Sequence, residues 1–404
     1  MQRIAGLFVF VLLAPSFLPA ETLLILPFFN LSNSKNIDWI GDSLSETIQE
    51  SLTREGLLMV PRSQRDRALD DLGIRRHVRL TRATIMEVAV NTDAVSVVSG
   101  AFEFTPSPDV ASTSLGQIRL QAEVLDARRL RRIAQVEESG PLEDLSRLQT
   151  RLAWRLLVLL ETQTSREEQR FLDDHPPVRL DALENYVRGL LSSTLDQKLA
   201  FFATAARLEP AYSEPCFQLG RIHFERKDYR AALEWLKRVL PADSHHRESL
   251  FLLGLTRYHL ADYPAARDAF ARIAADAPLG PVLNNLGVVQ LRLGDPAATS
   301  SLLRAVESDE ADPDFHFNLA YAHWRRGELP TAATRLRAVL ERSPDDETAA
   351  LLLARCEQAN GPRPGEPRFE NLERLKNTFD DTAWRHLKAI LGPDPPSAAP
   401  AEPR

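Results

Sequence analysis

The chain has 404 residues, of which 44% are apolar and 26% charged, so it is long enough for two or more domains and its composition does not indicate disorder. Its 49 basic and 56 acidic residues give a net charge of −7, which argues against nucleic-acid binding because that function usually brings a basic surplus. A peptide or protein partner fits this charge better.

Residues 1–20 have the pattern of a secretory signal peptide. Arg3 precedes the apolar run from Ile4 to Leu13, and the small residue Ala20 stands at a plausible cleavage site. The run is short and is followed by prolines, which does not favour a membrane span. We therefore expect export, with an uncleaved anchor as the main alternative.

Residues 21–165 alternate between strand and helix patterns. Strands are expected at 22–30, 57–60, 94–104, 117–126 and 130–137, and helices at 36–55, 63–72, 81–91 and 142–160. In the first helix, for example, apolar residues recur every four positions from Ile40 to Leu52. This order, with both local and crossover connections, predicts a compact α+β domain with a mixed sheet.

The following segment, 166–179, is charged and ends in Pro176 and Pro177, which is typical of a linker. From 180 to 360 a small residue then returns on the same side of a helix, at successive intervals of 31, 34, 33, 33 and 34 residues. These small residues are Gly189, Gly220, Gly254, Gly287, Ala320 and Ala354.

A second small residue follows the first by twelve positions in three of these units, and a large apolar residue comes four positions later. The pairs are Ala232 with Leu236, Ala266 with Phe270, and Ala332 with Leu336. A spacing of four places each pair on one face of a second helix. In the fourth unit the sequence "LGDPAATSSL" is one residue shorter between the helices.

A period near 34 with two helices per unit resembles the tetratricopeptide repeat. We therefore predict an all-α solenoid over 180–360. Beyond it, apolar residues recur at helical spacing from Phe369 to Leu391, which predicts a helix over 368–391 that caps the open end of the solenoid. Residues 392–404 are rich in proline and alanine and are expected to be disordered.

The amino-terminal region carries a second resemblance. The stretch "ILPFFNLSNSKNIDWIGDSLSETIQESL", the later "SGAFEF" and "LQAEVLDARR" are similar to the amino-terminal domain found in TolB, in the flagellar envelope protein FlgO and in bacterial proteins that continue into tetratricopeptide repeats. That family usually has a glycine in its final hairpin, where this chain has Ala127, Arg128 and Arg129. The resemblance implies a periplasmic interaction domain without catalytic activity.

No catalytic or metal-binding motif is present. The nine histidines show no metal-ligand spacing, and neither a phosphate-binding glycine loop nor a G-x-S-x-G sequence occurs. Acidic pairs such as Asp345 and Asp346 fall in repeat loops, where solvation explains them. Cys216 and Cys356 lie four repeats apart and are expected to be free, buried thiols. We therefore predict no catalytic residue, no metal and no cofactor.

The resemblance to tetratricopeptide repeats implies that the first helix of each unit lines a concave groove. Asparagine there can hold an extended peptide by donating to a carbonyl and accepting from an N–H, and aromatic rings offer flat apolar area. The alternative is that about half of these side chains, and the neighbouring Phe251 and Phe317, pack between helices. The predicted groove residues are Phe217, Arg221, Phe224, Tyr258, Asn284, Asn285, Arg292, Asn318, Tyr321, Trp324 and Arg325.

The sequence thus favours an exported, non-catalytic adaptor that binds a protein or peptide segment in its groove while the amino-terminal domain contacts an envelope component. An enzyme with its site in the first domain or at the inter-domain cleft is the alternative, and it predicts a concave pocket with converging acids and bases. A third possibility is an assembly subunit that oligomerises through the edge of the sheet. The oligomeric state stays open.

Overall fold

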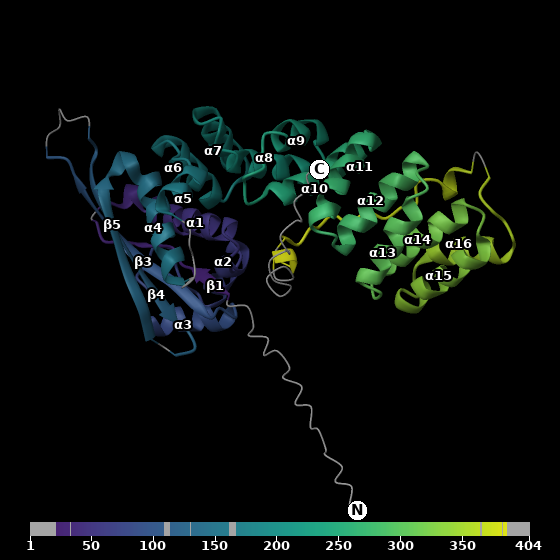
Figure 1. The fold of residues 1–404 in the computed structure, drawn as a ribbon, viewed down its shortest axis with the longest axis horizontal. Helices are drawn as coiled ribbons and strands as arrows, with labels where there is room; N and C mark the ends of the chain where they lie inside the picture. The colour runs from purple at the N-terminus through teal and green to yellow at the C-terminus, as the bar shows by residue number, and fades with distance from the viewer. Residues whose placement is uncertain are drawn as a thin grey trace, which may run out of the picture.

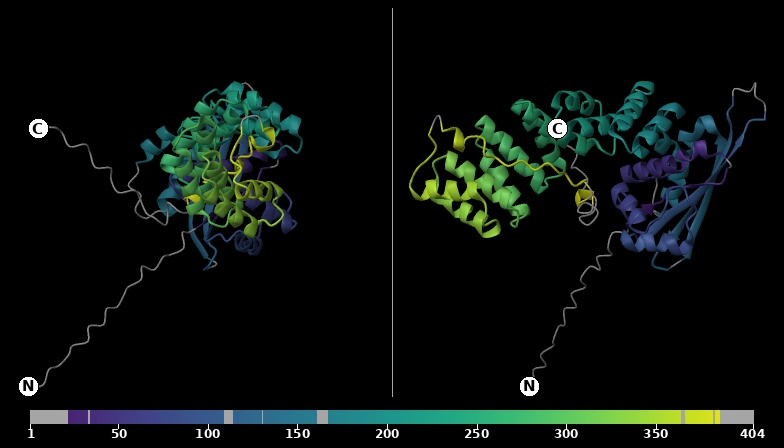
Figure 2. Two further views of the ribbon diagram at one scale, coloured as in Figure 1. Left: turned by 90° about the vertical axis from the view of Figure 1, so that its right-hand side faces the viewer. Right: turned by 180° about the vertical axis from the view of Figure 1, so that it is seen from behind.

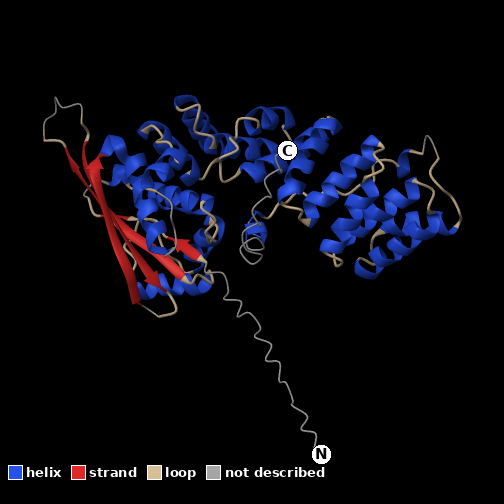
Figure 3. Ribbon diagram, in the orientation of Figure 1, coloured by secondary structure: helices blue, strands red, loops and turns tan. Residues whose placement is uncertain are grey.

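The computed structural model describes residues 22–385 except 33, 109–113, 130, 161–166, 364–365 and 382. The predicted signal peptide at 1–20, the end of the predicted capping helix at 386–391 and the predicted tail at 392–404 lie outside the described residues. An amino-terminal region of strands and helices is followed by a curved row of helices, with all the described strands at one end of the molecule (Figures 1 and 3).

The amino-terminal region is built on a mixed five-stranded sheet. Its main path runs β1 (Leu23–Ile25), β3 (Ser96–Pro106), β4 (Gly116–Asp126) and β5 (Arg131–Pro141), and β2 (Phe29–Asn30) also pairs with β3. Strands β1 and β2 are parallel to β3, whereas β4 and β5 continue the sheet in antiparallel pairs. The predicted strand at 57–60 is reduced to a single bridge between Leu23 and Met59.

Helices cover both faces of this sheet. The α1 (Trp39–Arg54) and α4 (Leu145–Leu160) helices share one core with Leu23 and Ile25. The α2 (Arg62–Asp71) and α3 (Arg82–Asn91) helices share another core with Leu24 and Leu26. Successive strand residues point to opposite faces, so a strand covered on both sides reads as a continuous apolar run.

The hairpin between β4 and β5 turns without glycine. The Asp126 carboxylate accepts hydrogen bonds from the backbone amides of Arg128 at 3.0 Å and Arg129 at 2.8 Å. A side chain that satisfies two turn amides in this way stabilises a tight turn.

The helical row has two helices in each repeating unit. A short helix, α5 (Glu168–Asp174), precedes it within the predicted linker, and its Phe171 is buried in the core that the sheet region shares with the first repeats. Within 167–179, Phe171 and His175 are thus buried, while most of the other residues are exposed. The helices of the row are α6 (Leu180–Leu191), α7 (Leu195–Leu208), α8 (Glu214–Glu225), α9 (Tyr229–Leu236), α10 (His246–His259), α11 (Tyr263–Asp276), α12 (Gly280–Leu293), α13 (Ala298–Ser308), α14 (Pro313–Arg325), α15 (Leu329–Arg342) and α16 (Glu347–Glu357).

The recurring glycines are the points where paired helices touch. A Cβ added to Gly220 would lie 2.5 Å from the Leu236 side chain, and one added to Gly254 would lie 2.6 Å from the Phe270 ring. In the unit that is one residue shorter, Gly287 meets Leu302 in the same way at 2.6 Å. The small-to-large spacing in the sequence therefore encodes the packing of each helix pair.

The segment after α16 is not the predicted capping helix. It has a 3-10 turn, η3 (Pro367–Phe369), then no helical residue from 370 to 380, and helical residues again at 381 and 383–385. It runs back along the helical row toward the amino-terminal region, as the yellow loop in Figures 1 and 2 shows. Among the described helices, none has the length and apolar character needed to cross a membrane.

Candidate peptide-binding groove

Residues 369–381, here called the groove segment, lie along the first helices of the last four units. These helices are α10, α12, α14 and α16. Side chains of α12 and α14 form hydrogen bonds with the groove segment, and side chains of α10 and α16 contact its aromatic rings. The groove is thus occupied by a part of the same chain, in a conformation without helix from residue 370 to 380.

Two asparagines bind the main chain of the groove segment in both directions. The Asn318 amide donates to the Arg374 carbonyl at 2.7 Å, and its oxygen accepts from the Arg374 N–H at 2.8 Å. Asn285 makes the same pair of bonds with Lys376, both at 2.8 Å. Because both bonds involve only backbone atoms of the groove segment, they recognise an extended chain irrespective of its side chains.

A third asparagine completes this network. Asn284 donates to the Arg374 carbonyl at 2.9 Å and accepts from Asn318 at 2.7 Å. All three asparagines are fully buried. Buried polar groups are stable only when they are hydrogen-bonded, so the groove segment satisfies groups that are costly to leave without a partner.

Carboxylates at the start of two helices bind the basic side chains of the groove segment. Arg374 contacts Asp346 at 2.6 Å and Asp314 at 3.2 Å, and the Lys376 ammonium lies 2.7 Å from both Asp312 and Asp314. Burial lowers the pKa of Lys376, but its hydrogen bonds to Asp312 and Asp314 outweigh burial and raise that pKa overall. Asp312 and Asp346 also cap α14 and α16 through their side chains.

The acidic residue of the groove segment meets arginines from the concave helices. The Glu373 side chain is fully buried and lies 2.6 Å from Arg292 and 3.8 Å from Arg325. Burial, the largest influence, raises the pKa of Glu373, while the charges of both arginines act to lower it. Arg292 also lies over the Tyr258 ring, with its guanidinium carbon 5.7 Å from the ring centroid.

Aromatic contacts mark both ends of the groove segment. Phe369 lies 5.9 Å from the Trp324 ring, and its carbonyl accepts a hydrogen bond from the Tyr321 hydroxyl at 2.8 Å. At the other end the rings of Phe379 and Phe251 stack at 5.4 Å. These contacts bury apolar area at both ends of the hydrogen-bonded residues.

The predicted groove residues separate into two groups. Seven of them surround the groove segment: Asn284, Asn285, Arg292, Asn318, Tyr321, Trp324 and Arg325. Tyr258 lies beneath Arg292 and so supports this group. Phe217 and Phe224 instead make ring contacts within the first units, and Phe217 and Arg221 line a different cleft, described below.

The sequence did not reveal the carboxylates of the groove. Asp346 belongs to an acidic pair that solvation alone was expected to explain, yet it binds Arg374. The recurrence of a helix-capping aspartate at 312 and 346, one repeat apart, is the sequence signal that could have identified these carboxylates.

Phe251 and Phe317 are fully buried, as the packing alternative expects, but each also contacts the groove segment.

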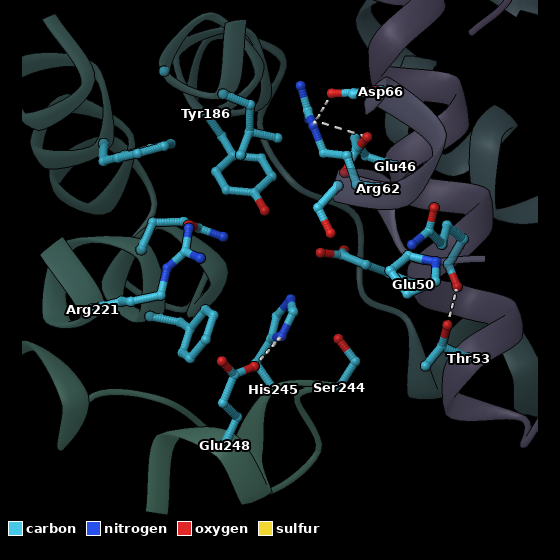
Figure 4. Close-up of a pocket in the computed structure, with 18 of the residues that line it drawn as sticks. Glu46, Glu50, Thr53, Arg62, Asp66, Tyr186, Arg221, Ser244, His245 and Glu248 are labelled. Atoms are coloured by element: carbon cyan, nitrogen blue, oxygen red, sulfur yellow. Dashed lines mark hydrogen bonds and ion pairs between the residues drawn. The ribbon is translucent and has the colours of Figure 1, made fainter. Parts of the chain in front are cut away.

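A separate cleft lies between the amino-terminal region and the first repeats, with a volume of about 1040 Å³. Its lining includes Glu46 and Glu50 of α1, Tyr186 of α6, and His245 and Glu248 near the start of α10 (Figure 4). Several of these groups already have partners within the chain: Glu46 pairs with Arg62 at 3.1 Å, and His245 with Glu248 at 3.7 Å.

Burial alters the acids of this region. It raises the pKa of Glu50 well above its ordinary value, and the negative charge of Glu214 adds to the effect. Glu214 lies outside the cleft lining and pairs with Arg54 at 2.9 Å, yet burial and the nearby Asp243 raise its pKa to about 7. Among the described residues, no group of three or more His, Cys, Asp or Glu side chains could hold a metal ion. Cys216 and Cys356 are free and buried, as expected.

Comparison with known proteins points to the repeats. The family model described as "Tetratricopeptide repeat" matches residues 217–281, 284–347 and 319–361. No curated protein sequence matches the chain.

Several solved structures are similar to parts of the chain, at low identity and with low TM-scores. MamA from Desulfovibrio magneticus RS-1 is 22% identical, with 40% of this chain and 92% of that chain covered and a TM-score of 0.36. YrrB, described as a TPR protein with an unusual peptide-binding site, is 20% identical, with 47% and 91% covered and a TM-score of 0.35. The C-terminal domain of LpoB from Salmonella enterica is 20% identical, with 31% and 87% covered and a TM-score of 0.23.

The family match begins at residue 217, inside the region in which a small residue returns at the repeat period and meets a large residue of the paired helix. Proteins built from these repeats are generally scaffolds for protein interactions. The part of the chain between residues 217 and 361 therefore carries tetratricopeptide repeats.

Proposed function

We propose that this protein is a non-catalytic adaptor whose repeats bind an extended segment of a partner protein in the groove of α10, α12, α14 and α16. The observation that carries the proposal is the pair of two-way hydrogen bonds from Asn285 and Asn318 to the main chain of the groove segment. This geometry is specific for an extended backbone and is independent of which chain supplies it.

In this proposal the groove segment is the internal occupant that a partner replaces. An occupant tethered to the repeats competes at an effective concentration set by its short connection, which is in the millimolar range for flexible linkers. A partner must therefore bind the open groove tightly or be present at high local concentration.

We further propose that the protein is exported to the periplasm and that its amino-terminal region contacts an envelope component. The signal-peptide pattern of residues 1–20 supports export. The resemblance of residues 22–165 to the TolB and FlgO amino-terminal domain supports the envelope contact. Detection of the processed protein in a periplasmic fraction would test the first of these points.

Photo-crosslinking in the native cell tests the groove directly. A photoreactive amino acid at Arg325, which borders the groove segment from α14 and is partly exposed, should crosslink to a segment of another protein that mass spectrometry can identify. Replacing Asn285 and Asn318 by alanine should abolish that crosslink, because the main chain of the partner loses its hydrogen bonds. The matched change Asn185→Ala, in α6 and away from the groove, should preserve it. Crosslinks that persist without Asn285 and Asn318 would refute the groove assignment.

The cleft favours one second candidate, an enzyme whose site lies between the amino-terminal region and the first repeats. The supporting observation is the convergence of Glu46, Glu50 and His245 on one cavity. Such a function requires a small molecule to bind there. Crystallographic soaking with fragment mixtures would separate the two candidates, since the adaptor proposal requires no ligand in this cleft.

A further inference from the structure

The charges that surround the groove segment are arranged in a fixed order. Along the groove segment, acidic Glu373 is followed by basic Arg374, apolar Leu375 and basic Lys376. The groove places arginines at the first position and aspartates at the second and fourth. We propose that the groove selects partner segments with this order of an acidic, a basic, an apolar and a second basic residue, a specificity that rests on the proposed peptide-binding function.

The asparagines make such a selection possible because they bind the backbone of alternate residues. Asn318 holds both backbone groups of Arg374, and Asn285 holds both backbone groups of Lys376. A shift of the segment by one residue breaks these four hydrogen bonds, whereas a shift by two residues re-forms them with the next alternate residues. The charges of the side chains then decide between registers that differ by two residues.

The first position requires an acidic side chain. The Glu373 side chain is fully buried and lies between Arg292 and Arg325. A lysine or arginine at this position would bury like charges together, and an apolar residue would leave Arg292 without its nearest carboxylate.

The second position favours arginine over lysine. The Arg374 guanidinium makes contacts of 2.6 and 2.9 Å with the two oxygens of Asp346, and it lies 3.6 Å above the Phe317 ring. A planar, forked group can bind a carboxylate at two atoms and stack on a ring at once, which an ammonium cannot do.

The fourth position suits a compact cation. The Lys376 ammonium lies between Asp312 and Asp314 at 2.7 Å from each, and 5.3 Å from the Phe315 ring. With Asp346, three carboxylates face two cations at these positions, so an acidic residue at either of them would be repelled.

Binding of three synthetic peptides tests the proposed charge order. The receptor is the full chain with Arg374→Ala and Lys376→Ala, which weakens the internal occupant while keeping every groove residue. The probes are the sequence of residues 369–381, a peptide with Glu373 and Arg374 exchanged (FENLRELKNTFDD), and one with Lys376 and Asn377 exchanged (FENLERLNKTFDD). All three peptides have the same composition and net charge.

Fluorescence anisotropy should show binding of the native sequence and at least tenfold weaker binding of both exchanged peptides. In a matched receptor variant, Asp314→Asn removes one of the two carboxylates at Lys376, so the native sequence should lose part of its advantage over the peptide with Lys376 and Asn377 exchanged. Circular dichroism confirms that each receptor stays helical.

The outcomes separate the two proposals. Equal binding of all three peptides would overturn the charge order and leave the peptide-binding function standing. Failure of every peptide to bind a folded receptor would overturn the peptide-binding function, and the charge order with it.

Discussion

At the scale of single residues, the groove depends on asparagine because one amide group both donates and accepts. Asn318 uses these two capacities on the N–H and the carbonyl of the same residue, Arg374. Its amide nitrogen also donates to Asn284. Aspartate has nearly the same shape but only accepts, so it would face two oxygens that it cannot bind.

Asn318→Asp should therefore detach the groove segment. We expect amide hydrogen exchange at residues 372–376 to accelerate at least tenfold, because a buried carboxylate next to two carbonyl oxygens costs roughly 1–3 kcal/mol or more. Hydrogen-exchange mass spectrometry measures the effect, with Asn185→Asp in α6 as the control. Unchanged protection of residues 372–376 would show that this asparagine does not hold the segment.

A second residue-scale prediction concerns Glu214, whose pKa is raised to about 7 by burial and by Asp243. The folded protein then holds a proton that the unfolded chain has released at the same pH. Stability should therefore fall as the pH rises from about 4.5, the ordinary value, to about 7. Glu214→Gln should remove this part of the pH dependence and raise the melting temperature at pH 8 relative to the wild type. If the melting temperatures of the two proteins change in the same way between pH 5 and pH 8, the assignment to Glu214 is wrong.

At the scale of elements, paired helices of the repeats touch through one small and one large residue. This contact is visible in the sequence because it recurs at the repeat period: Gly254 with Phe270, and Gly220 with Leu236. The conformation of the segment after α16 is instead set by contacts with distant residues. Its apolar residues have helical spacing, but Asn285 and Asn318 bind the backbone groups that a helix would use for its own hydrogen bonds.

Gly254→Ala should test the helix contact. The added methyl group would lie 2.6 Å from the Phe270 ring, so we expect a loss of about 1–3 kcal/mol in the free energy of unfolding. Urea denaturation measures this loss. Gly361→Ala is the control, because nothing lies within 4 Å of its added Cβ, and Phe270→Leu in the Gly254→Ala background should restore part of the stability. An unchanged midpoint in Gly254→Ala would mean that the two helices are less closely packed.

At the scale of the whole molecule, the end of the described chain connects the groove with the amino-terminal region. Arg385 donates to the Thr53 carbonyl of α1 at 2.8 Å and to the Ser244 carbonyl before α10 at 3.2 Å. Asp381 pairs with Arg247 at 2.7 Å, and Trp384 is buried in the core that joins the sheet region to the first repeats. The residues that follow the groove segment thus bind both the amino-terminal region and the first repeats, and these contacts help to keep the groove segment in place.

Arg385→Ala should consequently make the groove easier to enter. The internal occupant loses its hydrogen bonds to Thr53 and Ser244, so a labelled peptide of residues 369–381 should bind this variant several-fold more tightly than the wild type. Fluorescence anisotropy gives the comparison, and Arg363→Ala, which removes an exposed contact to Asn360, is the control. Equal affinity of the wild type and Arg385→Ala would show that the end of the segment does not restrain the groove.

The sequence by itself determined the features that depend on local, recurring patterns. The small and large residues at the repeat period predicted the helix pairs, alternating apolar residues predicted β4, and the offsets around the Leu-Gly pair indicated Asn285 and Asn318.

Tertiary structure alone decided what fills the groove. Asn285 donates to the Lys376 carbonyl 91 positions away, and Arg374 donates to the Asp346 carboxylate 28 positions away. No local pattern in the sequence indicates which distant group a side chain will contact. Residues 370–380 do not form the predicted helix, because side chains of the folded groove bind their polar groups and bury their charges. These partners are distant in sequence, so the segment's own residues do not reveal them.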